Sequence, residues 1–324
     1  MPVTVNHLLP RGMVLNIVMV FAILLYGVAV AAESRQPDTA TVSQNWHKLE
    51  LRDSGVTGSV TTRVELKTLP AAARQSTLLD APQLMSPRQA GKRIGVLEVA
   101  NSIRLLLGVD IEKRSRLWFN EDDGLPLQLI RLRQGNKPSQ KLYRFGSSQV
   151  YRQRRQPADR AETQQPAGDW SEISESYYSL PGPGEECPVI LESSQLLYRL
   201  SSPDHVFSET GGAFCVFDRQ HVYRVGFRNL GRAPLDVDYL QVEASQETRV
   251  KRTLQAIQVT LSGRPLDGAP ADVPPFSFLG LQGDIQLLFS DPGRIPLRVR
   301  GQVPGFGMID LELGELTRLR LASP

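Results

Sequence analysis

The chain has 324 residues, enough for one large domain or two modest ones with a substantial core. Hydrophobic residues make up 41% and charged residues 22%, which excludes a disordered chain and is ordinary for a folded protein. A formal net charge of +3 is too small to predict nucleic-acid binding. Most basic residues are arginine. That suits contacts with anionic headgroups or carboxylates, although the base composition of the gene is the explanation we favour.

The N-terminal segment has the order of a secretory signal peptide. Arg11 precedes an apolar run from Met13 to Val30, and small residues end at Ala32 before the sequence becomes polar. That order predicts a signal peptide at residues 1–32, cleaved near Ala32. The apolar run is long for such a peptide, so an uncleaved N-terminal membrane anchor is the alternative.

Export defines the expected domain organisation and location. We expect residues 33–44 to be a flexible lead-in and residues 45–324 to be one β-rich domain in the periplasm. No later stretch is long and apolar enough to predict a membrane helix. Contact with a membrane is therefore expected only transiently or through an uncleaved N-terminus.

Alternation of apolar and polar residues predicts β-strands along most of this domain. The 23 prolines and 26 glycines suit many short strands joined by tight turns. The stretch Ile94–Phe119 also fits helical spacing, but a hairpin signal at Gly108 favours two antiparallel strands. The other predicted strands are Trp46–Leu51, Gly58–Leu69, Leu127–Arg133, Leu142–Phe145, Val150–Tyr151, Trp170–Leu180, Ala213–Phe217, Val222–Phe227, Val237–Val242, Leu254–Leu261, Ile285–Phe289, Ile295–Val299 and Met308–Leu313.

One motif occurs twice in the chain. Phe119 is followed seven positions later by Pro126, and Phe289 is followed at the same spacing by Pro296, with an acidic residue and a glycine between them. An apolar run, a polar turn and a second apolar run predict a β-hairpin. Each returning strand should start, bulge or lie at an edge at its proline, which has no N–H to donate. The repeat predicts a sheet built from two similar halves.

The basic residues of the chain centre suggest two features. In the strand predicted after Pro126, Arg131 and Arg133 share the face opposite Leu132. Further on, a polar, arginine- and proline-rich stretch predicts an exposed loop at about residues 152–168.

Three arginines open that predicted loop. Arg152, Arg154 and Arg155, with two tyrosines nearby, could mark an anionic patch, meaning a surface that receives anionic groups. A charge run beside a loop is usually just solvated, and this is the interpretation that we favour.

A short helix and a disulfide are predicted together in the second half. Pro188 suits the first turn of a helix, and the apolar residues from Val189 to Leu200 form a stripe that ends before Pro203. In an oxidising compartment Cys187 and Cys215 predict a disulfide rather than a metal pair, with two buried thiols as the alternative. Closing that loop would stabilise the fold by roughly 3–4 kcal/mol in the entropic account.

Sequence signatures of catalysis and of cofactor binding are absent. The chain has no glycine-rich phosphate loop, nucleophile elbow or zinc-binding motif. The acidic string at residues 120–124 lacks the ligand spacing of a calcium loop and is explained by a hairpin turn. We therefore expect no enzyme activity, no cofactor and no metal site.

The two hairpins carry a family resemblance. Residues 116–145 and 284–313, the latter including Ile295-Pro296-Leu297 and the closing strand to Leu313, resemble a family of uncharacterised exported proteobacterial β-proteins. That family is similar in outline to the lipoprotein-carrier half-barrels, whose curved antiparallel sheet holds acyl chains against a helix. The resemblance implies no catalytic residue.

The combined prediction is a mainly β protein with a strongly curved antiparallel sheet or open barrel and one short helix packed against it. A curved sheet with an apolar face can receive a lipid or another amphiphile, which is the first hypothesis for function. The second is a structural or interaction protein of the cell envelope that binds a protein partner and has no small-molecule ligand.

Overall fold

The fold was analysed in a computed structural model. It describes residues 44–55, 58–69, 78–79, 81, 84, 86–105, 110–182, 187–203, 205, 211–266 and 272–318. The predicted signal peptide or anchor at residues 1–32 and the lead-in up to residue 43 lie outside these ranges. None of the helices in the described ranges is long and apolar enough to cross a membrane.

The protein is mainly β, as the alternation predicts, and its fifteen described strands form one sheet. The first half contains β1 Lys48–Gly55, β2 Gly58–Leu69, β3 Ile94–Leu105, β4 Asp110–Asn120, β5 Pro126–Gln134, β6 Ser139–Phe145, β7 Gln149–Gln156 and β8 Glu172–Ser179. The second half contains β9 Ile190–Glu192, helix α2 Gln195–Leu200, β10 Gly212–Asp218, β11 His221–Glu243, β12 Gln246–Pro265, β13 Gln282–Ser290, β14 Pro296–Val303 and β15 Gly307–Arg318.

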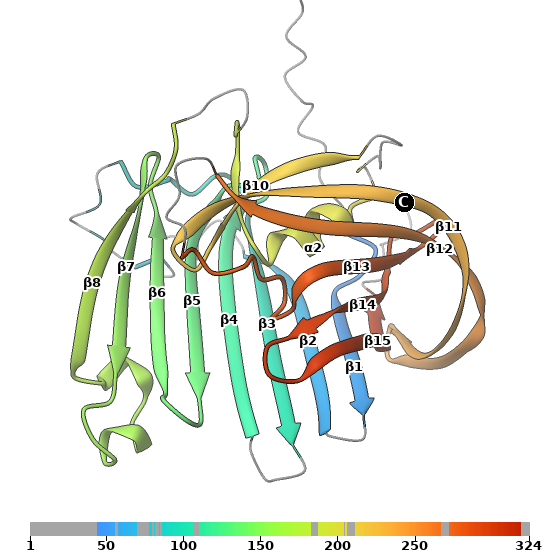
Figure 1. The fold of residues 1–324 in the computed structure, drawn as a ribbon, viewed down its shortest axis with the longest axis horizontal. Helices are drawn as coiled ribbons and strands as arrows, with labels where there is room; N and C mark the ends of the chain where they lie inside the picture. Colours follow the sequence, from blue (N-terminus) through green and yellow to red (C-terminus); the bar gives the residue numbers. More distant parts are fainter. Residues whose placement is uncertain are drawn as a thin grey trace, which may run out of the picture. The chain divides into compact units, whose positions relative to one another are not determined.

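The sheet consists of two meanders joined by their outermost strands. The strands β1 to β8 pair in sequence order, β9 to β15 do the same, and β1 pairs antiparallel with β15. Two pairings are parallel, β9 with β10 and the end of β15 with β11. In Figure 1, β3 to β8 form a twisted wall and β10 to β12 cross over its upper end.

The sheet curls until its second half packs on the inner face of the first. Phe217 of β10 is fully buried, and its ring centroid lies 5.9 Å from Tyr143, 5.6 Å from Phe145 and 6.2 Å from Tyr178. Strands far apart in the sheet order therefore share one hydrophobic core. The predicted strong curvature is confirmed, since an open flat sheet could not bring β10 onto β6 and β8.

The two motif hairpins have the same backbone geometry. Phe119 lies opposite Pro126, and Phe289 lies opposite Pro296. In both hairpins the strand register shifts between the phenylalanine and the residue before it. The turn of the first hairpin places Gly124 at φ 70°, and the equivalent position of the second is Arg294 at φ 54°. At Gly124 a side chain is excluded as well, because a Cβ atom would lie 1.6 Å from Nη2 of Arg199. The predicted hairpins are confirmed.

The helix prediction is only partly right. Residues 190–192 form β9, paired in parallel with residues 215–217, and α2 covers only Gln195–Leu200. A continuous buried run of apolar residues has the same appearance in a strand and in a helix, and here pairing with β10 decides the outcome. Val189, expected on the helix stripe, is exposed.

The helix α2 packs against the first motif hairpin. The Gln195 side chain donates a hydrogen bond of 3.0 Å to the carbonyl of Gly124, and the Arg199 side chain donates one of 3.0 Å to the carbonyl of Asp123. The ring of Tyr198 lies 5.0 Å from that of Phe119. The expectation of one short helix against the sheet is therefore confirmed, with a shorter helix than the sequence predicts.

Two predicted boundaries are wrong. The strand β7 continues to Gln156 and pairs with β8, so the predicted loop at residues 152–168 begins only after that residue. The short strands predicted at 222–227, 237–242 and 254–261 are parts of one long hairpin, β11 and β12. Much of this hairpin is exposed, so its sequence lacks a regular apolar alternation.

Candidate functional site

A basic cavity of about 440 Å³ lies on the inner face of the first meander. We call it the cationic chamber. Six basic side chains among those lining it are Lys113, Arg131, Arg133, Lys141, Arg154 and Arg219. The first five come from the consecutive strands β4 to β7, and Arg219 follows β10.

Strand register places like charges side by side in this chamber. Lys113 lies directly opposite Arg133, and Lys141 lies opposite Arg131 on one side and Arg154 on the other. Like charges at directly opposed positions destabilise a sheet by roughly 0.2–1 kcal/mol per pair. Three such pairs on neighbouring strands weaken the fold, so a contribution to stability does not explain why they are present.

Most of these cations have no anionic partner. Lys113, Arg133, Lys141 and Arg154 form no ion pair or hydrogen bond through their side chains within the described part of the chain. In Arg133 and Arg154 the Nε atom is itself buried and lacks an acceptor. Buried polar groups are nearly always hydrogen-bonded in folded proteins, so these two donors point to an acceptor that the chain does not supply.

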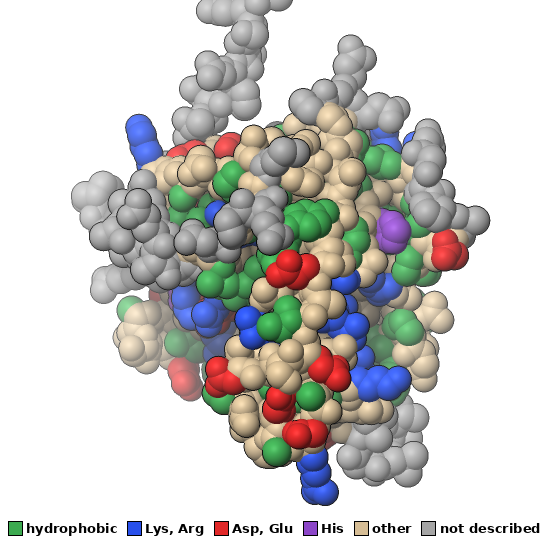
Figure 2. Space-filling view, turned by 90° about the vertical axis from the view of Figure 1, so that its left-hand side faces the viewer, with side chains coloured by type: hydrophobic (Ala, Val, Ile, Leu, Met, Phe, Trp, Pro, Cys, Tyr) green, Lys and Arg blue, Asp and Glu red, His purple; other side chains and the backbone are tan. Residues whose placement is uncertain are grey.

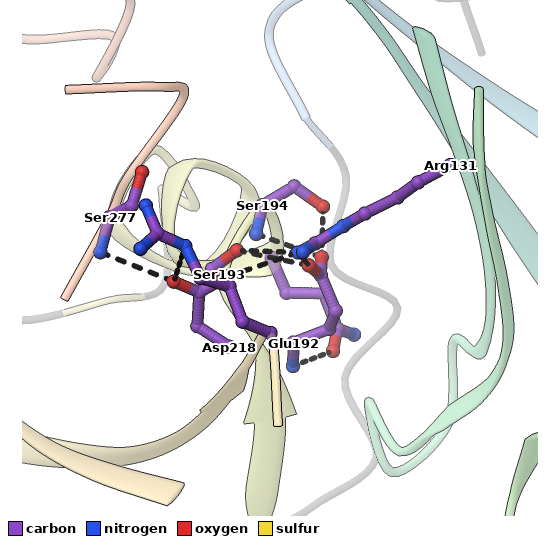
Figure 3. Close-up of polar contacts among 8 residues, drawn as sticks. Arg131, Glu192, Ser193, Ser194, Asp218 and Ser277 are labelled. Atoms are coloured by element: carbon purple, nitrogen blue, oxygen red, sulfur yellow. Dashed lines mark hydrogen bonds and ion pairs between the residues drawn. The ribbon is translucent and has the colours of Figure 1, made fainter. Parts of the chain in front are cut away.

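Two buried carboxylates line the chamber, and both form ion pairs with Arg131 (Figure 3). The Arg131 guanidinium reaches from β5 to Glu192 at 2.6 Å and Asp218 at 3.2 Å. The two carboxylate side chains are only 1% and 3% exposed. Burial alone lowers the pKa of Arg131, but Glu192 and Asp218 outweigh it and raise that pKa above its ordinary value.

Backbone and serine donors complete this group. Glu192 also accepts hydrogen bonds from the Ser193 hydroxyl at 3.0 Å and the Ser194 amide at 2.9 Å, and Asp218 accepts one from the Ser277 amide at 3.3 Å. The Nε atom of Arg219 lies 3.7 Å from Asp218 as well, so Arg131, Arg219 and these donors together satisfy the two carboxylates. The charges of Lys113, Arg133, Lys141 and Arg154 stay without an anionic partner in the described part of the chain.

Two lysines of the chamber, Lys141 and Lys113, have a lowered pKa because they are buried and, second, because arginines lie nearby. Burial and then the charges of Arg154 and Arg131 lower the pKa of Lys141 to about 8. Burial, followed by the charge of Arg133, also lowers the pKa of Lys113. A bound anion reverses this effect, because a nearby negative charge favours the protonated ammonium.

A second cavity of about 200 Å³ shares part of its lining with the chamber. Both cavities are lined by Asn101, Lys113 and Arg219, so they meet along these side chains. The remaining wall of the second cavity is mainly aliphatic and includes Val60, Ile103, Ile111, Leu281, Val303 and Leu311. The inner face of the sheet therefore has two neighbouring cavities, one lined by several cations and one lined mainly by aliphatic side chains.

The three arginines of the sequence-predicted anionic patch do not act together. Arg154 lines the chamber. Arg152 donates to the Ser176 hydroxyl at 3.0 Å and lies over the ring of Tyr178. Arg155 points to the opposite face, where it donates to the carbonyl of Gly168 at 2.8 Å. Alternation along β7 separates Arg155 from the other two.

The other predicted site residues are structural. Phe119, Pro126, Phe289 and Pro296 are buried in the two hairpins. Cys187 and Cys215 form the predicted disulfide, with their Cα atoms 5.5 Å apart.

That disulfide links the two segments that lead to the chamber carboxylates. It joins the entry of β9 to β10, the two strands that end at Glu192 and Asp218. It therefore ties together the two segments that carry the buried carboxylates.

Sequence reasoning missed Lys113 and Lys141. The shared face of Arg131 and Arg133 was the one visible signal, but the neighbours of that face depend on pairing between strands. No group of three or more His, Cys, Asp or Glu side chains suited to a metal ion occurs in the described part of the chain.

Charge is segregated on the surface too. Figure 2, seen from the β8 side, shows Lys and Arg side chains gathered at mid-height on both sides of a central ridge, which carries most of the visible Asp and Glu. The small net charge of +3 is therefore compatible with strongly basic local regions.

Comparison with known proteins identifies no family. No protein family and no curated protein matches the sequence. A crystal structure of a β-barrel-like protein of the domain of unknown function DUF1849 from Brucella abortus superimposes with a TM-score of 0.45 and 10% sequence identity, over 85% of this chain and 98% of that chain. A similarity this low does not indicate a function, so we infer the function from the side chains of the chamber.

Proposed function

We propose that the protein binds an amphiphile with an anionic polar end, and that it does so as an exported protein of the bacterial envelope. The observation that carries this proposal is the cationic chamber with unpaired side chains, next to a cavity whose lining is mainly aliphatic. The anionic end lies among Lys113, Arg133, Lys141 and Arg154, and the apolar end extends past Ile111.

The dimensions and chemistry support this assignment. Cavities of about 440 and 200 Å³ lie within or near the range of small-molecule sites, roughly 300–1,000 Å³. A bound anion offsets the repulsion between the cations of the chamber. Relief of that repulsion contributes to the free energy of binding. Binding needs no catalytic group, in keeping with the expectation that the protein is not an enzyme.

Export is supported by two separate features. The sequence order before Ala32 is that of a signal peptide, and the disulfide fits an oxidising compartment. The test is N-terminal sequencing of the protein from a bacterial periplasmic fraction. A start near Ala32 or Glu33 supports export with cleavage, whereas an intact Met1 in the membrane fraction indicates an anchor.

The test of binding has two arms. The first is mass spectrometry of organic extracts of the protein purified without detergent, in which an anionic lipid should copurify. The second is calorimetric titration with dodecyl sulfate and with dodecyltrimethylammonium, both below their micellar concentrations. Only the anionic probe should bind. Equal binding of both probes, or of neither, would overturn the proposal.

A specific observation favours the second candidate function, an interaction protein. The strand β8 forms one edge of the sheet and exposes Ile173 and Tyr177, which are 49% and 43% exposed. An edge strand with exposed apolar side chains can pair with a strand of a partner protein. The double variant Ile173→Ser with Tyr177→Ser should then abolish capture of that partner without altering titration of the anionic probe, because alternation places both side chains on the face away from Arg154.

A further inference from the structure

The charges of the chamber also indicate which kind of anionic group the ligand carries. This inference rests on the function proposed above. Lys113, Arg133, Lys141 and Arg154 have no anionic partner in the described part of the chain, whereas Arg131 and Arg219 together balance the two buried carboxylates. A single carboxylate on the ligand would leave most of this charge uncompensated. A group with two or more negative charges balances it better.

Register brings the four cations within reach of one group. Lys113 and Arg133 are directly opposed, as are Lys141 and Arg154. Arg133 follows two residues after Arg131, the partner of Lys141, so Arg133 and Lys141 are diagonal neighbours. Directly opposed Cβ atoms are about 5 Å apart and diagonal ones about 7–8 Å, within reach of these long side chains.

The donors also match phosphate in kind. Two guanidinium groups supply planar forks that bind phosphate in a bidentate manner, and two ammonium groups add point charges. The Nε atoms of Arg133 and Arg154 are buried without an acceptor. A phosphate offers three or four oxygens in several directions, so donors that arrive from four adjacent strands can be satisfied by the same group.

We propose that the chamber binds a phosphate group with at least two negative charges, a phosphomonoester or a diphosphate, through Lys113, Arg133, Lys141 and Arg154. Such a group occurs at the polar end of phosphorylated amphiphiles and also in free inorganic form. The chemistry of the chamber is common to both sources. The neighbouring cavity, lined mainly by aliphatic side chains, favours the amphiphile.

The test is isothermal titration of the full mature chain with inorganic pyrophosphate and with dodecyl phosphate and dodecanoate, the two amphiphiles being kept below their micellar concentrations. Dodecyl phosphate should bind at least tenfold more tightly than dodecanoate, and pyrophosphate should bind detectably alone. Affinity for both phosphates should fall as salt concentration rises. Equal affinities of dodecyl phosphate and dodecanoate overturn the phosphate inference and leave amphiphile binding intact. If neither binds, the proposed function fails as well.

The source of the phosphate follows from the same titration. Tighter binding of dodecyl phosphate than of pyrophosphate supports the phosphorylated amphiphile. Binding of pyrophosphate with no gain from the alkyl chain supports the phosphate site and overturns the amphiphile.

A double variant separates a ligand site from a structural cluster. Lys113→Gln with Arg133→Gln should weaken binding of dodecyl phosphate at least tenfold, yet raise or preserve the melting temperature of the ligand-free protein, because it removes a repelling pair. The matched control is Arg116→Gln on the same strand β4, where Arg116 pairs with Glu98 on the other face at 2.8 Å. It should leave the affinity unchanged. Lower stability of the double variant without loss of affinity would show that these cations are structural.

Discussion

The repeated hairpin makes a quantitative prediction at Phe119. Its side chain is fully buried, and its ring lies 5.0 Å from that of Tyr198. A Cβ atom on Gly95, the opposed residue on β3, would lie 2.4 Å from Cζ of Phe119. The ring therefore covers a backbone position where no side chain is available to fill the space that its removal leaves.

Those contacts set the expected cost of Phe119→Ala. Truncating a buried phenylalanine costs about 3–5 kcal/mol, and an aromatic pair contributes about 0.5–1.5 kcal/mol beyond its buried area. We expect a loss near the upper end, about 4–5 kcal/mol. The equivalent Phe289→Ala should cost about 3–5 kcal/mol, since Phe289 is also fully buried.

The assay is urea unfolding followed by circular dichroism, with the free energy of unfolding extrapolated from the midpoint and slope. Leu230→Ala is a matched control, because Leu230 is 50% exposed and its loss should change stability by less than about 0.5 kcal/mol. If both phenylalanine variants unfold within about 1 kcal/mol of the parent protein, the hairpins do not anchor the core and the reasoning is refuted.

Four further predictions follow from the disulfide and the buried charges. Thiol titration of the unfolded, unreduced protein should find no free thiol and reduction should lower stability by roughly 3–4 kcal/mol; two thiols per chain would contradict this. Arg131→Met should cost about 3–5 kcal/mol by leaving Glu192 without a cation and Asp218 with only the more distant Arg219 at 3.7 Å, and adding Glu192→Gln and Asp218→Asn should recover most of the loss in denaturant unfolding. Burial, with nearby arginine charges, lowers the pKa of His205 to about 4 from 6.5, so the unfolded chain binds more protons in that window and stability should fall as pH drops from 6.5 to 4; an NMR titration giving a pKa near 6.5 would be inconsistent. The pKa of Lys141, lowered to about 8 from 10.5, makes stability rise with pH between those values, and Lys141→Met should flatten this part of the pH profile of unfolding.

Local patterns in the sequence determined the fold class. Period-two alternation predicts the strands, and proline and glycine mark many of the turns. The spacing of Phe119 to Pro126 and of Phe289 to Pro296 predicts two hairpins, whose matching register the structure confirms. These features succeed because each depends on residues a few positions apart, where backbone sterics and hydrogen bonding decide the conformation.

Tertiary structure determined the type and length of those elements for which the local sequence pattern is ambiguous or irregular. Residues 190–192 form a strand because β10 offers a parallel partner, a fact that their apolar character does not contain. The long hairpin of β11 and β12 extends through exposed positions where alternation is lost. In both cases pairing with a distant or adjacent strand supplies the hydrogen bonds that local propensity leaves undecided.

The cationic chamber was also decided by tertiary structure. Arg131 and Arg133 share a face by alternation alone, but their neighbours Lys113 and Lys141 are fixed by the register of β4 and β6. The carboxylate of Glu192 reaches Arg131 only because the sheet curls. Register and curvature depend on burying the whole inner face at once, so a cluster built across four strands has no signature in any single stretch of sequence.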